Sequence, residues 1–557
     1  MRITVLSEST IYMPIKRKKC SYIYTSMKPS NTSYIFPTHY LQSLTRSIIF
    51  GWLTLMSLAL ACKDPSMPAQ AEILITGGMI YHKNQLIEND ILISGEKISW
   101  VGPVDTSKVR IEKVINAQGM LVTPGFIDAH AHGNPLNTPE FENFLNMGVT
   151  TIVLGQDGFS QDQGEFQNWA DRVDSIKPAV NIVPFVGHSS LRAQSKIGFD
   201  ENPSFSDLQR MDSLLSNAME AGYFGLSTGL EYLPGGKAKA NELELLAKTV
   251  GRYDGLMMSH VRNEDDDQIE KSFAELFNLA KFCRVHVAHI KVVYGKGTDR
   301  AEAILDYIND YRAKSAFEIT SDFYPYNASY TGIGILFPSW AKPPNDYQSV
   351  LNSRGGELLE YLRNRVTKRN GPQATLMGTQ PYSGLTLEAI AIREKKPFEE
   401  LLAYDIGPSG ASAAYFIMDS ALQNRLVQDE YVMIGSDGSP TMRHPRGYGS
   451  FAKVIQEYVL KENLFSMEEA LRKMTALPAN TLRLEDRGAI AVGSFADLVV
   501  FDPKNIRANA TFDQPHKLSS GFEYVLVNGE VVISKGKNTS NRPGRTLKKP
   551  LKTDNGS

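Results

Sequence analysis

Residues 126–132 read FIDAHAH, and this short stretch decides the fold of the chain. An apolar start that runs into polar residues is typical of a buried strand that ends at the edge of a sheet. Because alternate residues of a strand share one face, the imidazoles of His130 and His132 are expected side by side. A lone histidine at a strand end is usually an ordinary hydrogen-bonded residue, but a pair at this spacing predicts a metal site.

Seven more strand-like segments follow, and amphipathic segments with helical spacing separate the early ones. Eight strands that alternate with helices predict an α/β fold, a (β/α)8 barrel, over residues 123–487. The connection at residues 331–430 is much longer than the others and predicts a lid or an inserted subdomain. The seven segments are TTIVLGQD (150–157), NIVPFVGH (181–188), YFGLSTGL (223–230), LMMSHV (256–261), VHVAHIKV (285–292), FEITSDFYPY (317–326) and VMIGSDG (432–438).

Short strands are also predicted on both sides of the barrel. Residues 71–122 contain AEILITGGMIY and ILISGEKISWVG, and residues 488–545 contain ADLVVFD and YVLVNGEVVISKG, in which VNGE predicts a hairpin turn. Two short β blocks that flank a long middle predict one small β-domain built from both ends. The polar and basic residues 546–557 predict a loosely held tail.

The N-terminal residues 1–62 resemble an export segment. Arg46 precedes the apolar run IIFGWLTLMSLALA (48–61), which is too short for a membrane span but suits the core of a signal peptide. The small residues before Cys62 resemble a bacterial lipoprotein cleavage site. We therefore expect an exported protein, either periplasmic or anchored to the membrane as a lipoprotein through Cys62. A signal peptide without lipid is the alternative, and Met27 is a second candidate for the true start.

The composition excludes some classes of partner. Of the 557 residues, 59 are Lys or Arg and 61 are Asp or Glu, so the net charge is -2. This balance favours neither nucleic acid nor an anionic membrane surface, and we expect a small molecule as the partner. Three cysteines do not favour a disulfide framework, so the fold depends on packing.

Metal-ligand residue types fall at the ends of five of the predicted strands. The carboxyl ends of the strands in such a barrel form one rim, so these residues are expected to converge there. Four imidazoles and two carboxylates form an N/O ligand set suited to zinc and to other borderline metals. Asp-Gly is also a common turn pair, so the alternative for Asp437 in IGSDG is a turn residue. The six residues are His130, His132, Asp157, His260, His289 and Asp437.

Five of the six remaining histidines are interpreted as structural. His286 stands three residues before His289, so within a strand it faces the other way. The others assigned to this class are His39, His82, His188 and His516.

Several motifs carry a resemblance to a known family. GMLVTPGFIDAHAH (119–132) resembles the opening motif of the amidohydrolase superfamily, and six further motifs resemble the N-acyl-D-amino-acid deacylase (D-aminoacylase) family. The resemblance runs from about residue 71 to residue 545, and the motifs keep their order. The six are GLSTGLEYLPG (225–235), SHVRNE (259–264), AHIKVVYGKG (288–297), FYPYNAS (323–329), IGSDG (434–438) and HPRGYGSF (444–451), and RGAIAVGSFADLVVFDP (487–503) resembles the family's return to its small β-domain.

The resemblance implies a distorted barrel with a β-sandwich, a mobile lid, and hydrolysis of linear amide bonds with one or two divalent cations. It implies that His130 and His132 hold one metal position, that His260 and His289 hold the other, and that Asp437 is both ligand and catalytic base. One residue departs from the family pattern, because Asp157 stands where better-known members have a metal-binding cysteine. A carboxylate is a harder ligand than a thiolate, so Mn²⁺ or Co²⁺ becomes an alternative to Zn²⁺.

The resemblance also implies which residues bind the substrate carboxylate, namely Tyr232, Lys291 and Arg446. Lys291 lies two residues beyond His289 and so shares its strand face. Arg446 offers a planar fork that matches a carboxylate. Tyr324 and Tyr326 either line the pocket or form a structural bend.

Other functions stay open at this point. The leading hypothesis is release of a free D-amino acid from an N-acyl-D-amino acid, and its D preference rests on the resemblance alone. A dipeptidase acting on small peptides with D-residues and a cyclic-amide hydrolase are the enzymatic alternatives. Cyclic-amide hydrolases usually need a carboxylated bridging lysine, and no lysine ends an early strand near Asp157. A non-catalytic envelope binding lipoprotein is the alternative from another class.

Overall fold

The FIDAH segment forms β8 (Phe126–Asp128), the first of eight strand positions around a common interior. Neighbouring strands run parallel, and a parallel bridge between Ala131 and Gly438 joins the first position to the last. The third position is split into two short strands, of which β10 pairs with β9 and β11 pairs with β12. The other strands are β9 (Val149–Leu154), β10 (Asn181–Pro184), β11 (Val186–Gly187), β12 (Gly225–Gly229), β13 (Leu256–His260), β14 (Arg284–Val287), β15 (Ile319–Phe323) and β19 (Val432–Ile434).

The computed structural model describes residues 67–550, which belong to one compact unit. The predicted export segment and its lipid-attachment residue Cys62 lie outside these residues. Among the helices of the described range, none combines the length and the apolar character that crossing a membrane requires.

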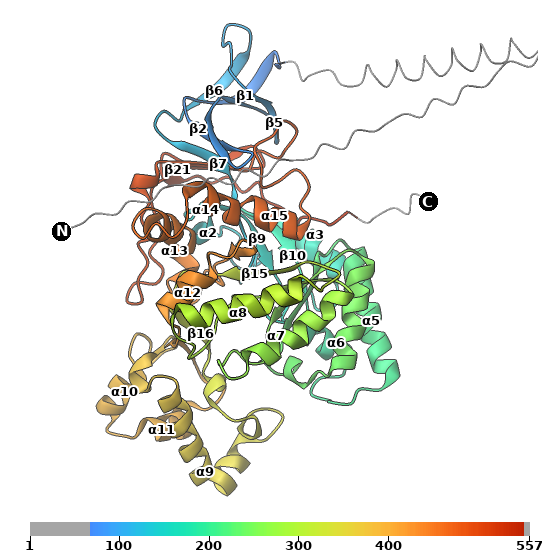
Figure 1. Cartoon of the computed structure of the whole chain (residues 1–557), viewed down its shortest axis with the longest axis vertical. Helices are drawn as coiled ribbons and strands as arrows, with labels where there is room; N and C mark the ends of the chain where they lie inside the picture. The colour runs from blue at the N-terminus through green and yellow to red at the C-terminus, as the bar shows by residue number, and fades with distance from the viewer. Residues whose placement is uncertain (1–66, 551–557) are drawn as a thin grey trace, which may run out of the picture. The chain divides into compact units, whose positions relative to one another are not determined.

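Amphipathic helices cover the outside of the barrel. α5 shows why: Ser204 caps it together with Asp207, and the helix turns Leu208, Met211 and Leu215 toward the core. Figure 1 shows α5 to α8 in sequence order beside the strands, and contacts between neighbouring helices agree with this order. The main helices of the barrel are α3 (Phe166–Ile176), α4 (His188–Gln194), α5 (Phe205–Glu220), α6 (Ala240–Arg252), α7 (Ile269–Phe277), α8 (Gly297–Arg312), α12 (Ser420–Leu426), α13 (Arg446–Lys453), α14 (Met467–Met474) and α15 (Ala476–Leu482).

The interior of the barrel is filled with apolar side chains, including Ile127, Val153, Phe185 and Met258. Such a barrel is a packed core and not a pore. Polar side chains therefore gather where the strands end, and the ligand-type residues lie at the carboxyl ends.

The end of the described chain differs from the prediction of a loosely held tail. Ile182 of β10 donates its amide to Arg545 O and accepts from the amide of Leu547, at 2.9 and 2.7 Å. Leu547 packs against the apolar cluster of the barrel interior, and Thr546 is buried. The prediction was wrong here because it rested on polar composition, whereas one apolar side chain and backbone hydrogen bonds hold these residues.

The small domain is made from both ends of the chain. β20 (Leu498–Phe501) pairs antiparallel with β7 (Leu121–Pro124), and their sheet has the order β23-β22-β21-β20-β7-β2-β3. A second sheet, β5-β4-β1-β6, shares an apolar cluster with the first. The remaining strands are β1 (Gln70–Thr76), β2 (Met79–His82), β3 (Gln85–Glu88), β4 (Ile91–Ser94), β5 (Lys97–Val101), β6 (Arg110–Asn116), β21 (Phe522–Val527), β22 (Glu530–Ser534) and β23 (Lys537–Asn538).

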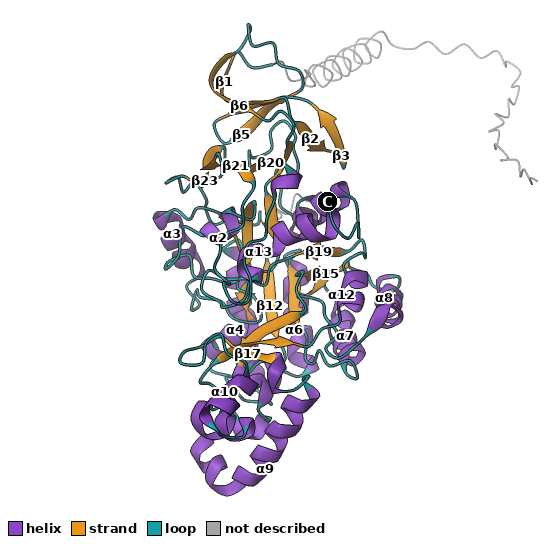
Figure 2. Cartoon of the chain, turned by 90° about the vertical axis from the view of Figure 1, so that its left-hand side faces the viewer, coloured by secondary structure: helices purple, strands orange, loops and turns teal. Residues whose placement is uncertain are grey.

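The long connection between β15 and β19 forms a subdomain, which we call the insertion. Figure 2 shows its helices α9 and α10 and its strand β17 grouped together below the barrel strands. The insertion has its own three-stranded sheet, β16-β18-β17, and its own apolar cluster, in which Val293 and Tyr324 join it to the barrel. Its elements are β16 (Ala328–Gly332), α9 (Tyr347–Lys368), β17 (Thr375–Met377), α10 (Leu387–Glu394), α11 (Phe398–Glu400) and β18 (Ser412–Phe416). Together these parts confirm the predicted (β/α)8 barrel with a small β-sandwich.

Candidate metal centre

The structure brings the six predicted ligand residues together at the carboxyl ends of the barrel strands. They come from five strands, which explains how residues far apart in sequence become neighbours. His130 and His132 follow β8, Asp157 follows β9, His260 ends β13, His289 follows β14 and Asp437 follows β19.

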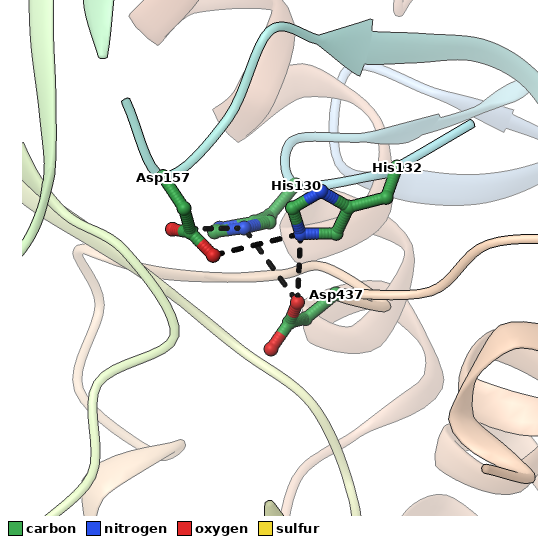
Figure 3. A group of neighbouring side chains, drawn as sticks. All are labelled: His130, His132, Asp157 and Asp437. Atoms are coloured by element: carbon green, nitrogen blue, oxygen red, sulfur yellow. Dashed lines mark hydrogen bonds and ion pairs between the residues drawn. The ribbon is translucent and has the colours of Figure 1, made fainter. Parts of the chain in front are cut away.

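Four of these side chains form a first group, in which the ligand atoms face one another (Figure 3). His132 Nε2 lies 3.0 Å from Asp437 Oδ1 and 3.6 Å from Asp157 Oδ2. His130 Nε2 lies 3.5 Å from Asp157 Oδ1 and 3.7 Å from Asp437 Oδ1.

Asp157 also belongs to a second group with the two remaining histidines. Its Oδ1 lies 3.6 Å from His289 Nε2, and that nitrogen lies 3.0 Å from His260 Nδ1. One carboxylate therefore stands between two sets of imidazoles, which is the position of a bridging ligand.

The backbone is unusual at three of the six residues. Their φ values lie in the left-handed region, which residues other than glycine rarely adopt: 54° at Asp157, 37° at His289 and 48° at Asp437. Such conformations persist where the surrounding structure imposes them, and they cluster at functional sites. Each of the three turns its side chain into the cluster directly after a strand.

The donor atoms fit a divalent cation. His130 Nε2 and Asp157 Oδ1 are buried and have no hydrogen-bond partner among residues 67–550. Buried polar atoms without a partner are costly, and a cation would satisfy both. Zinc binds nitrogen and oxygen at about 2.0 Å in tetrahedral sites, which separates its ligand atoms by about 3.3 Å. The separations of 3.0 to 3.7 Å within the two groups agree with this value.

Two carboxylates outside the ligand set orient the imidazoles. Asp322 Oδ2 lies 3.4 Å from His130 Nδ1, and Glu231 Oε2 lies 2.9 Å from His260 Nε2. The hydrogen bond that His260 donates to Glu231 fixes the tautomer of His260 and leaves Nδ1 for a metal, whereas Asp322 acts on His130 as an ion-pair partner. Neither residue was predicted from the sequence, where the available signal was an acidic residue inside a strand (TSDF) or next to Tyr232 (LEY).

Asp322 is also the link to His286. Its Oδ2 lies 2.8 Å from His286 Nε2, and its Oδ1 accepts the backbone amide of His289 at 2.9 Å. His286 therefore supports Asp322 and does not face the two ligand groups. His188 is likewise outside them, since its Nε2 lies 2.7 Å from Glu242.

The charges around His130 determine how strongly a proton competes with a metal cation for its imidazole ring. Burial alone would lower the pKa of His130, but the carboxylates of Asp322 and Asp157 outweigh it and raise that pKa well above its usual value. A cation must therefore displace a proton from this ring. Metal affinity is expected to increase with pH for this reason.

The predicted base Asp437 has a guanidinium beside it. Arg446 Nη1 lies 2.8 Å from Asp437 Oδ2, while Oδ1 faces His132. Burial alone would raise the pKa of the Asp437 carboxyl, but Arg446, His289 and His132 outweigh it and hold that pKa well below its usual range. Asp437 is therefore ionised at neutral pH.

Lys291 also lies beside a carboxylate of the chain. Its Nζ lies 2.8 Å from Glu264 Oε1 and 2.9 Å from His289 Nδ1. Lys291 and Arg446 were predicted at the substrate carboxylate, but each also contacts a carboxylate of the chain. The Lys291 contact joins segments that follow two different strands, and the Arg446 contact closes the loop that follows β19, so strand periodicity reveals neither.

A cavity of about 610 Å³ opens onto the ligand groups. Its volume is that of a small-molecule site. Tyr232, Lys291 and Arg446 line it, and the insertion contributes Tyr330, Thr331 and Arg369. The metal centre and the insertion therefore share one cavity.

The tyrosines of the FYPYN motif are not among the lining residues. The ring of Tyr324 lies 4.7 Å from the guanidinium of Arg446, and the Tyr326 hydroxyl donates to Pro445 O at 3.4 Å. Both tyrosines thus support the residues of the site from outside the cavity. Tyr232 differs, since its ring lies 4.5 Å from that of His260.

Comparison with known proteins places these features in context. The model of the amidohydrolase family matches residues 401–533. An N-acyl-D-glutamate deacylase of Alcaligenes xylosoxydans xylosoxydans is 33% identical over 486 residues, which cover 83% of this chain and 92% of that protein.

Solved structures agree with this likeness. The N-acyl-D-glutamate deacylase of Bordetella bronchiseptica, crystallised with zinc and a phosphonate mimic of the tetrahedral intermediate, has a TM-score of 0.74 and 29% identity, covering 86% of this chain and 100% of that one. A D-aminoacylase described as having a binuclear metal centre has a TM-score of 0.73 and 28% identity over the same shares.

We predict that Asp322→Asn weakens metal binding without unfolding the protein. The substitution keeps the shape of the side chain but removes the charge that orients His130, and loss of such a partner lowers metal affinity by about 10- to 100-fold. Chelator competition with the purified variant measures this. The control is Asp306→Asn on the exposed face of α8, and equal affinities in the two variants would contradict the orienting role.

Proposed function

We propose that this protein hydrolyses N-acyl-D-amino acids to a carboxylate and a free D-amino acid. The chain belongs to the amidohydrolase family and, within it, to the N-acyl-D-amino-acid deacylases. One observation carries this proposal: four histidines and two aspartates converge in a cavity of small-molecule size, where His130 Nε2 and Asp157 Oδ1 have no other partner among the described residues. The similarity to a deacylase over 92% of its length supports the reaction type.

There are two places for a cation, one on each side of Asp157. His130, His132 and Asp437 would hold a cation on one side, and His260 and His289 would hold a cation on the other. When bound, a divalent cation lowers the pKa of water to about 7 and polarises the substrate carbonyl. The protein's own contribution is to move the proton. Asp437 accepts it from the attacking water through Oδ1 and passes it to the leaving amine.

Arg446 and Lys291 position the reactants. Arg446 holds Asp437 through Oδ2, so Oδ1 keeps one orientation. Its Nε is buried without a hydrogen-bond partner among residues 67–550, and a substrate carboxylate would satisfy it. Lys291 and Tyr232 line the same cavity and complete the group that would bind the α-carboxylate.

Zinc is the cation we propose, with Mn²⁺ and Co²⁺ as accepted alternatives. The imidazoles suit zinc, whereas the carboxylate of Asp157 is a harder ligand than the cysteine of better-known family members. Asp157 lies between the two groups, so it influences both the identity and the number of the cations.

We predict that metal-stripped protein reconstituted with Zn²⁺ releases amine from N-acetyl-D-amino acids and much less from their L-enantiomers. Asp437→Asn should lose activity by about 10²- to 10⁴-fold, because proton transfer by a positioned side chain is worth that much. A fluorogenic amine assay measures both. Asp513→Asn at an exposed position is the matched control.

The same panel separates the alternatives. Preferred hydrolysis of dipeptides that contain D-residues would favour the dipeptidase, and opening of hydantoins would favour the cyclic-amide hydrolase. Reconstituted protein that hydrolyses none of these substrates would contradict the proposed function.

We predict that Asp157→Cys shifts the metal preference toward zinc. A thiolate selects zinc over manganese more strongly than a carboxylate does. Equilibrium competition between Zn²⁺ and Mn²⁺, measured by elemental analysis of the desalted protein, should show a higher zinc fraction in the variant. An unchanged fraction would exclude Asp157 from the ligand set.

We also propose export through residues 1–62, with lipid attachment at Cys62. The apolar run before Cys62 and the small residues at its end support this. Fractionation of bacterial cells should place the wild type with membranes and Cys62→Ala in the soluble fraction or in unprocessed form. Identical fractionation of the two would contradict the lipid anchor.

A further inference from the structure

Arg369 is a buried cation of the insertion that the reaction described above does not use. It follows α9 directly, is 2% exposed and lines the cavity of the metal centre. A guanidinium cannot lose its charge, and a buried charge is costly unless an opposite charge and hydrogen bonds compensate it.

Among the described residues, Arg369 lacks the carboxylate partner that the other two cations of the cavity have. Lys291 and Arg446 each lie 2.8 Å from a carboxylate. Within residues 67–550 no carboxylate forms an ion pair with Arg369, and its Nε has no hydrogen-bond partner. Its guanidinium lies 5.0 Å from the ring centre of Tyr415, a contact that supports the cation but leaves its donors unused.

A carboxylate of the barrel that faces this end of α9 already has cationic partners. Asp265 lines the cavity, but its Oδ2 lies 3.1 Å from Arg365 Nη1 and 3.2 Å from Lys368 Nζ. These two cations precede Arg369 on the same helix. The helix end therefore carries three cations beside one carboxylate, and Arg369 is the one without an ion-pair partner in the part of the chain that the structure describes.

The position of Arg369 separates it from the reacting atoms. Arg446 contacts Asp437, and Lys291 contacts His289, so both belong to the part of the cavity next to the scissile bond. No ligand residue contacts Arg369. Its neighbour Tyr415 lies opposite Ser329 across β16 and β18, which places Arg369 by the wall that the insertion contributes.

We infer that Arg369 binds a second carboxylate of the substrate, in addition to the α-carboxylate. This rests on the proposed function and names its substrate class: N-acyl amino acids with two anionic groups. The guanidinium fork matches a carboxylate with two parallel hydrogen bonds. The second carboxylate belongs either to an acidic amino-acid side chain or to the acyl group, and the recognition chemistry is the same.

Two pairs of substrates test the inference with zinc-loaded enzyme. N-acetyl-D-glutamate against N-acetyl-D-glutamine varies the side chain, and N-succinyl-D-leucine against N-butyryl-D-leucine varies the acyl group. In one pair the wild type should prefer the anionic member by about 10- to 100-fold in kcat/KM, the range expected for a charge-assisted hydrogen-bonded pair. The pair that shows the preference identifies the source of the carboxylate.

Variants assign the preference to Arg369. Arg369→Gln should lower kcat/KM for the anionic member by about 10- to 100-fold and remove the preference, while Arg369→Lys should retain part of it. Arg363→Gln is the matched control, because Arg363 is 58% exposed on the same helix and pairs with Glu399 outside the cavity. Arg369→Gln that lowers both members of a pair equally, or a wild type without preference in either pair, would overturn the inference. Should Arg369→Gln fail to fold, the wild-type ratios and Arg369→Lys decide.

A binding measurement separates this inference from the proposed function. Calorimetric titration of the zinc-loaded protein with D-glutamate and D-glutamine, and with succinate and butyrate, reports anion selectivity without turnover. Selective binding that Arg369→Gln abolishes would support the role of Arg369 even if no N-acyl-D-amino acid were hydrolysed. Hydrolysis of neutral substrates without any anion selectivity would leave the proposed function intact and reject the second-carboxylate site.

Discussion

The carboxylate of Asp157 joins the two halves of the metal centre. Its Oδ1 lies 3.5 Å from His130 Nε2 and 3.6 Å from His289 Nε2, so histidines from opposite parts of the barrel meet at one side chain. The left-handed backbone at Asp157 turns that side chain inward after β9. Asp157 is the residue that the four-residue group and the group with His260 and His289 share.

Charge compensation explains how so many ionisable groups stay buried at one rim. Three ion-pair contacts compensate these charges: His130 with Asp322, Arg446 with Asp437, and Lys291 with Glu264. In a low-dielectric interior each such pair offsets the cost of desolvation, whereas an unpaired charge requires a ligand. The same reasoning separates the paired cations of the cavity from Arg369.

The insertion packs on the barrel and brings its own side chains to the cavity of the metal centre. Its apolar cluster includes Val293 and Tyr324 from the barrel, so it packs directly on the loops that carry the site. It also supplies part of the wall of the cavity, including Tyr330 and Arg369. Under the proposed function, side chains of the insertion would therefore contact the part of the substrate that is remote from the reacting bond.

The sequence by itself determined the eight strand positions, the small β-domain built from both ends, the family, and the six residues that meet at the rim, because periodicity and motif order are local signals. Only the tertiary structure revealed the roles of Asp322 and Glu231, the carboxylate partner of Lys291 and, within residues 67–550, the lack of an ion-pair partner for Arg369. It also corrected the C-terminal end, where Leu547 packs into the barrel despite its polar neighbours. Each of these depends on contacts between distant segments, and residue spacing carries no information about which side chains meet across strands and loops.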